Sequence, residues 1–192
     1  LDGATVVIPG KVEGTNFTDS LLVGHSTTGT LSSASENTGV GIAALDAITS
    51  GDSNTAVGNN AGTAITSGGS NVVLGNGAGK ALTDTSNNIG IGDTALYKCD
   101  GAGNVGVGKN ALFNAVVADY NIAVGYQSGD NITTGSGNVV IGKADVSSAT
   151  GDDQLSISDG EDGSVVWMTG DSSGNVIHAG TTHSAGGQLT TT

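Results

Sequence analysis

One glycine recurs at a nearly fixed interval through most of the chain, and this spacing constrains the fold more than any other feature. Successive members are separated by 17 residues, except for one interval of 16. Self-similarity at a fixed period indicates a solenoid, in which each unit forms one coil and stacks on the next. This repeat glycine is represented by Gly24, Gly41, Gly58, Gly75, Gly92, Gly108, Gly125 and Gly142.

A second column lies four residues before the repeat glycine. It holds asparagine in all units but the first, where Ser20 takes its place. If the units stack at the ~4.8 Å spacing of β-strands, these side chains form a ladder of amide hydrogen bonds. The column comprises Asn37, Asn54, Asn71, Asn88, Asn104, Asn121 and Asn138.

Mostly β-branched residues stand three and one positions before the repeat glycine. Side chains alternate along a strand, so these two positions share one face, which we expect to point into the core. The members directly before the glycine are Val40, Val57, Leu74, Ile91, Val107, Val124 and Ile141. A second inward set, seven residues after the glycine, includes Ile48, Ile65, Leu82, Cys99 and Ile132.

The composition indicates a thin interior. The 192 residues include 34 Gly and only 3% aromatic residues, whereas a globular core of this size would use more large side chains. Such a composition is also typical of disorder, but the regular apolar spacing argues against it. We therefore predict an all-β fold, a parallel β-solenoid or β-roll of about eight turns of 16–17 residues.

Each unit would bury only a few small side chains, which is marginal for an isolated solenoid. Thin, elongated folds commonly gain the missing burial from partner chains. The sequence therefore favours an intertwined homotrimer, with a monomeric solenoid as the alternative.

The repeat divides the chain into segments. Residues 1–19 are expected to form an N-terminal cap or linker, with a short strand over residues 5–8. Residues 20–149 form the repeat β-roll. Because the chain begins with Leu1 rather than Met, we expect a fragment or a processed product.

Beyond the repeat, residues 150–180 predict a small C-terminal β-meander that caps the open end of the solenoid. Its expected strands include residues 155–158 and 164–169, separated by an acidic turn. Residues 181–192 are rich in Thr and Gly and predict a flexible tail.

Charge and cysteine content exclude several classes of function. The net charge of −13, with 5 Lys and Arg residues, disfavours nucleic acid as a partner. No apolar run is long enough for a membrane-spanning helix, so we expect no membrane insertion. One cysteine permits neither an internal disulfide nor a four-cysteine metal site.

The sequence offers no catalytic constellation. It has no Ser-His-Asp motif, and the glycine-rich stretch at residues 75–79 lacks the Lys-Ser/Thr end of a phosphate-binding loop. Acidic residues between 152 and 162 lack calcium-loop spacing and are expected to form a solvated turn. We therefore expect no enzyme activity, no cofactor and no metal.

A threonine column eight residues after the repeat glycine suggests ice binding as a less favoured hypothesis. Asp100 and Val116 interrupt the column, which weakens this interpretation. Its members are Thr49, Thr66, Thr83 and Thr133.

The units at residues 54–62 and 121–129 resemble repeats of bacteriophage tail-fibre and other virion structural proteins. They are also similar to the head repeats of trimeric autotransporter adhesins, although the unit here is longer, which favours the phage interpretation. The resemblance implies a homotrimeric structural and adhesive segment of a tail fibre, located on the extracellular virion. Its alternative is the head domain of a bacterial trimeric adhesin on a cell surface.

This resemblance implies other virion or fibre proteins as partners, and a host-surface glycan or protein as the receptor. Trp167 is a candidate receptor-binding residue because its ring could stack on a sugar, with burial in the cap as the alternative. Tyr126, in the column that follows the repeat glycine, is a second candidate.

Overall fold

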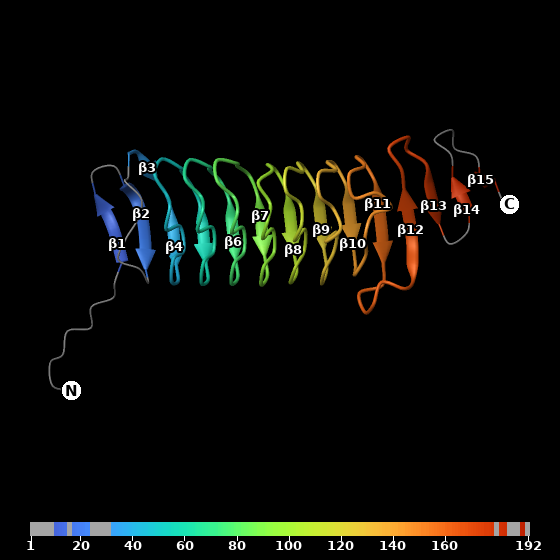
Figure 1. The fold of residues 1–192 in the computed structure, drawn as a ribbon, viewed down its shortest axis with the longest axis horizontal. Coiled ribbons are helices and arrows are strands. Elements are labelled where there is room, and N and C mark those ends of the chain that lie inside the picture. The colour runs from blue at the N-terminus through green and yellow to red at the C-terminus, as the bar shows by residue number, and fades with distance from the viewer. Residues whose placement is uncertain (1–9, 15–16, 24–31, 179–180, 184–188, 191–192) are drawn as a thin grey trace, which may run out of the picture.

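The computed structural model describes residues 10–14, 17–23, 32–178, 181–183 and 189–190, and side chains are described within 20–23 and 32–178. These residues contain strands and turns and no helix. The strands form one continuous sheet in chain order, with β1 and β15 at opposite ends of the row (Figure 1). Only β3 lies off this path, paired with β2.

The strands are short through the repeat and longer at both ends. Their bounds are β1 Gly10–Gly14, β2 Phe17–Val23, β3 Ala34–Ser35, β4 Thr38–Val40, β5 Thr55–Val57, β6 Val72–Leu74, β7 Ile89–Ile91, β8 Val105–Val107, β9 Ile122–Val124, β10 Val139–Ile141, β11 Leu155–Ser158, β12 Val166–Gly170, β13 Val176–His178, β14 Thr181–His183 and β15 Leu189–Thr190.

Equivalent residues of successive units lie side by side, which confirms the predicted parallel β-solenoid. Strands β2 and β4 to β11 pair in parallel, and Val40 lies opposite Val57, which in turn lies opposite Leu74. The unit of 16 residues keeps this register, because Ile91 still pairs with Val107. By alignment, its missing residue falls in the turn between Asp100 and Gly101.

The side chains that point into the core are one position away from the predicted ones. The middle residue of each three-residue strand is buried, whereas Val40 and Val57 are 40% exposed and Ile91 is 37% exposed. The buried asparagine and the middle residue are two positions apart and so share the inward face. The predicted inward position is therefore wrong for Val40, Val57, Leu74, Ile91, Val107, Val124 and Ile141, which face outward.

The opposite wall of the interior lies seven residues after the repeat glycine. From residue 48 to residue 132 the side chains in this column are fully buried, and they include the predicted core residues Ile48, Ile65, Leu82, Cys99 and Ile132. Gly24 of the repeat glycine column lies outside the described residues.

In four coils, a small residue in one interior column is accompanied by a larger one in a second interior column. Where the middle strand residue is Gly39, the residue four after the repeat glycine is Leu45; where the middle residue is Val73, the corresponding residue is Gly79. A Cβ added to Gly79 would lie 2.5 Å from Val73 Cγ1. The same pairing of small with large recurs at Gly90 with Leu96 and at Gly106 with Leu112, whereas the coils with Ala56 and Gly62 and with Ala123 and Gly129 have two small residues at these positions.

The asparagine column forms a continuous buried ladder. Asn54 donates from its backbone N and its Nδ2 to Asn37 Oδ1, at 3.0 and 3.1 Å, and its Nδ2 also donates to the Gly68 carbonyl at 2.9 Å. Each amide thus satisfies backbone groups that the narrow coil would otherwise bury without partners. Ser20 Oγ accepts from Asn37 N at one end, and Gln154 donates to Asn138 Oδ1 at the other.

The C-terminal boundary lies later than expected. Strand β11 pairs in parallel with β10, and Gln154, directly before β11, continues the asparagine ladder. Residues 155–158 therefore belong to the parallel stack as well as to the meander. From β11 to β15 the pairing is antiparallel, which gives the meander. Residues 181–192, predicted as a flexible tail, contain β14 and β15.

The N-terminal end is a hairpin. Strands β1 and β2 pair antiparallel, and β2 then joins the parallel stack through β4. The hairpin therefore extends the sheet by one strand beyond the solenoid. The strand predicted at residues 5–8 lies outside the described residues.

Candidate interaction surface

The outer face of the sheet is an apolar surface that follows the repeat. Each strand from β4 to β10 sends its first and last side chains outward because its middle one points into the core. We call this surface the sheet face; it holds no charged residue. It comprises Thr38, Val40, Thr55, Val57, Val72, Leu74, Ile89, Ile91, Val105, Val107, Ile122, Val124, Val139 and Ile141.

The two edges that flank the sheet face differ in charge. The trailing edge, formed by the residue after each repeat glycine, carries Lys109, Lys143 and Asp93. The leading edge, five and six residues before the glycine or its equivalent Ser158, is acidic and holds no lysine within residues 32–158. Its acids are Glu36, Asp52, Asp119, Asp152 and Asp153.

Aromatic and lysine side chains form short ladders outside the coil. The rings of Tyr97 and Phe113 stack with centroids 5.1 Å apart and 4° between their planes. Lys80 Nζ lies 5.1 Å from the centroid of Tyr97 and donates to its hydroxyl at 3.1 Å. Since each ring or ammonium lies against its counterpart in the next coil, the ladder reinforces the stack.

The two predicted receptor-binding residues are exposed and lie on different elements. Tyr126 directly follows β9, is 47% exposed, and has Lys143 Nζ 5.4 Å from its ring centroid. Trp167 lies in β12 and is 52% exposed, so it does not form the centre of the cap. Strands β10 and β11 separate the two residues in the sheet, and the sequence alone could not indicate this separation.

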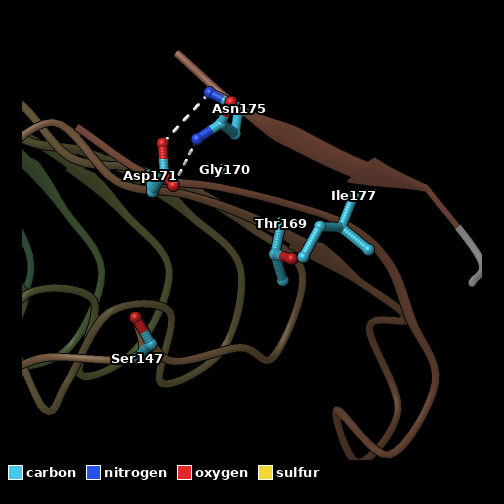
Figure 2. A pocket seen from close by; sticks show the side chains of 6 residues that line it. All are labelled: Ser147, Thr169, Gly170, Asp171, Asn175 and Ile177. Carbon is cyan, nitrogen blue, oxygen red and sulfur yellow. Dashed lines mark hydrogen bonds between the residues drawn. The ribbon is translucent and has the colours of Figure 1, made fainter. Parts of the chain in front are cut away.

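A pocket of about 470 Å³ lies where the meander meets the last coils (Figure 2). Thr169 and Ile177 line one side and Ser147 another, while Asp171 and Asn175 belong to the β12–β13 turn. Asp171 Oδ1 accepts from the backbone of Ser173 and Asn175, and its Oδ2 accepts from Asn175 Nδ2. The Asn175 side chain, followed by these backbone donors, lowers the pKa of Asp171. The Asp171 carboxylate is thus occupied by its own turn.

A smaller pocket is lined by acidic residues and one lysine. Partial burial, followed by the neighbouring Asp145 carboxylate, raises the pKa of Asp130, while Lys143 opposes the shift. Within residues 32–178, no group of three or more His, Cys, Asp and Glu side chains is placed to hold a metal ion. The carboxyl groups of Asp130, Asp145 and Asp162 thus line this pocket beside Lys143 without being placed to hold a metal ion.

The acidic stretch before β12 organises a turn. Asp159 Oδ1 accepts from the backbone N of Glu161, Asp162 and Gly163, and its Oδ2 accepts from Val165 N at 2.7 Å. The bonds from Gly163 and Val165 are the main cause of the lowered pKa of Asp159. The carboxylate is thus occupied by its own loop.

Cys99 is a core residue. Its side chain is fully buried, and burial raises the pKa of the thiol to about 11. A nucleophilic cysteine needs thiolate character and access, and Cys99 has neither.

The threonine column is turned toward its own backbone. Thr49 Oγ1 donates to the Thr66 carbonyl at 3.0 Å, and Thr66 Oγ1 donates to the Thr83 carbonyl at 3.3 Å. Thr133 bonds the Ala149 carbonyl in the same way, at 3.2 Å. Hydroxyls engaged between coils are not arranged to order water, which disfavours the ice-binding hypothesis.

In the described part of the chain, no helix is long and apolar enough to cross a membrane. Comparison with known protein families, curated proteins and solved structures found no match to this chain.

Proposed function

We propose that this chain is a structural and adhesive segment of a homotrimeric bacteriophage tail fibre, carried on the extracellular virion and without catalytic activity. The observation that carries the proposal is the uninterrupted parallel stack from β2 to β11, capped by antiparallel strands at both ends. Such a stack is a stiff spacer of roughly 40 Å at the strand spacing.

Stiffness is supported by bonds on every side of the coil. Besides the sheet, backbone bonds join successive turns, such as Leu45 N to the Ala61 carbonyl and Ala47 N to the Thr63 carbonyl. The buried asparagine ladder adds a third line of bonds along the same axis. A rod held along several lines resists bending, as a fibre segment must.

The homotrimer is supported by the small interior. Each strand contributes one inward side chain, and several of these are glycine or alanine. Partner chains would supply apolar burial that a single coil lacks.

Host attachment is proposed to use exposed side chains repeated on each copy. Tyr126 and Trp167 offer ring faces of the kind that contact sugars, and multivalency would raise the avidity of individually weak contacts. The partner would be a glycan or protein of the host surface.

Immunoelectron microscopy of virions tests the proposal, with antibodies raised against this chain. We expect label on the tail fibres, and a mass of three chains for the purified protein by light scattering. Label confined to a bacterial surface would overturn the phage assignment in favour of a bacterial adhesin. A monomeric mass at all concentrations would overturn the homotrimer.

A further inference from the structure

We infer that the sheet face is the surface through which copies of this chain pack against one another, and that they pack in parallel with equivalent coils at one level. The inference rests on the proposed self-assembling fibre segment. It adds which surface makes the contact and how the copies are oriented.

The first argument is the chemistry of the sheet face. The chain carries a net charge of −13, yet the two outward columns from β4 to β10 contain only Val, Ile, Leu and Thr. Contiguous apolar patches larger than a few hundred Å² are rare on monomeric proteins and mark interaction sites. The sheet face extends this pattern over seven consecutive strands.

The second argument is area. Exposed fractions near 40%, as at Val57 and Val124, leave roughly 50 Å² on each side chain. Eight of the fourteen positions are exposed and six are half-buried, so the face offers on the order of 600 Å², somewhat below the ~800 Å² per partner of a standard interface. The face is therefore large enough for a stable contact.

The third argument identifies the partner. Outward side chains repeat at the strand spacing over the whole face, so its ridges and grooves have one period. A partner surface with the same spacing of side chains can match the sheet face along its full length. A second copy of this chain has that spacing because its strands are stacked in the same way. A partner without the repeat would match only a few coils.

The fourth argument fixes the orientation. In a parallel arrangement, the trailing edge of one copy faces the leading edge of the next. Lys109 follows β8, and the Asp119 carboxylate reaches the same level because its Oδ1 accepts from Ala102 N, ahead of β8. Lys143 follows β10, and Asp152 Oδ1 accepts from Ser136 N, ahead of β10. In a parallel pair, lysine therefore meets carboxylate at nearly equal height. In an antiparallel face-to-face pair each edge would meet its own kind, and the acidic edges would repel.

Substitution on the sheet face tests the contact. We expect the wild-type chain to be oligomeric by analytical ultracentrifugation and the Val57→Lys/Val124→Lys variant to sediment as a monomer. Both valines point outward, so the circular dichroism spectrum should be unchanged. The control is Val117→Lys, which changes a side chain that is 59% exposed but lies outside the sheet, and should leave the oligomer intact.

Cysteine cross-linking tests the orientation. The double variants Thr38→Cys/Val40→Cys and Val139→Cys/Ile141→Cys place thiols at both outward positions of β4 and of β10, toward opposite ends of the sheet face. Parallel copies predict that each variant, oxidised alone, forms disulfide-linked dimers. Antiparallel copies predict cross-links only when the two variants are mixed. The wild-type chain serves as the control, because its single thiol is buried.

The outcomes separate this inference from the proposed function. An oligomer that survives the lysine substitutions, or cross-links only in the mixture, overturns the inference and leaves the fibre segment standing. Tail-fibre labelling bears on the fibre assignment alone. A wild-type chain that is monomeric at all concentrations overturns the inference and the proposed homotrimer together.

Discussion

Single polar residues hold the coils together, and the asparagine ladder is the main example. Each member is fully buried and bonds both neighbours, so a coil without room for a large core still satisfies its backbone. The sequence predicted this ladder from spacing alone. Such a ladder is predictable because stacked asparagine side chains have one arrangement in which every amide forms its hydrogen bonds.

Asn88→Ala should lower the free energy of unfolding by roughly 2–3 kcal/mol, because it leaves the buried Asn104 backbone N without its acceptor. Urea denaturation followed by circular dichroism measures the change. Asn76→Ala is the matched control, since Asn76 is exposed and outside the ladder, and it should cost under about 0.5 kcal/mol. Equal effects of the two substitutions would contradict the ladder's role.

Cys99 should resist thiol reagents in the folded chain. Its raised pKa of about 11 keeps the thiol protonated at pH 8, and its burial blocks access. Labelling with a chromogenic disulfide should be slower by at least about 100-fold than after unfolding in urea. A rate in buffer equal to that in urea would show that the coil opens at this site.

At the scale of the coil, the sequence predicted which residues of neighbouring strands pair, but not which side chains of each strand point into the core. The sequence placed Val57 beside Leu74 correctly, but turned both inward. β-Branched residues are usually expected to be buried. Here the alternation of side chains along the strand places them on the outer face instead. Asn54 is buried, and Ala56, two residues later, must share its face.

The compensation between Val73 and Gly79 gives a double-mutant test of coil packing. Gly79→Leu alone should destabilise the chain by several kcal/mol, because its Cβ would lie 2.5 Å from Val73 Cγ1 and 2.8 Å from Leu82 Cδ1. Adding Val73→Gly reproduces the Gly90 and Leu96 pairing found one coil later. We expect the double variant to be more stable than additivity predicts by at least about 1 kcal/mol.

Chemical denaturation of the four chains in this cycle gives the coupling energy. The control cycle pairs Gly79→Leu with Val140→Gly, four coils away, and its effects should add. Coupling of the same size in both cycles would mean that the interior is not packed coil by coil.

For the whole molecule, the strands at the two ends of the sheet determine whether rods associate end to end. The solenoid was predictable because its period is carried by many units at once. The limits of the cap were not, because β11 serves both the parallel stack and the meander. The receptor-binding candidates could be named from exposed aromatic chemistry, but their separation depends on sheet order.

Removing residues 159–192 should cause end-to-end association, because β11 then presents an unpaired edge to solvent. Light scattering should rise with protein concentration, and electron microscopy should reveal filaments. A chain ending at residue 178 keeps the β11 edge covered by β12 and exposes instead the three-residue strand β13, which lies outside the parallel stack and is too short to pair well, so this chain should remain discrete. Identical behaviour of the two truncations would contradict a protective role for these antiparallel strands.

The shortened unit has a consequence for how such a rod can diversify. The turn between Asp100 and Gly101 lacks a residue that other units have, yet Ile91 and Val107 remain in register. The length of this turn can therefore change without altering how the strands pair. Segments inserted at this turn would project from the side of the rod at a fixed position along its axis. Such insertions could vary between related chains while the length of the rod stays the same.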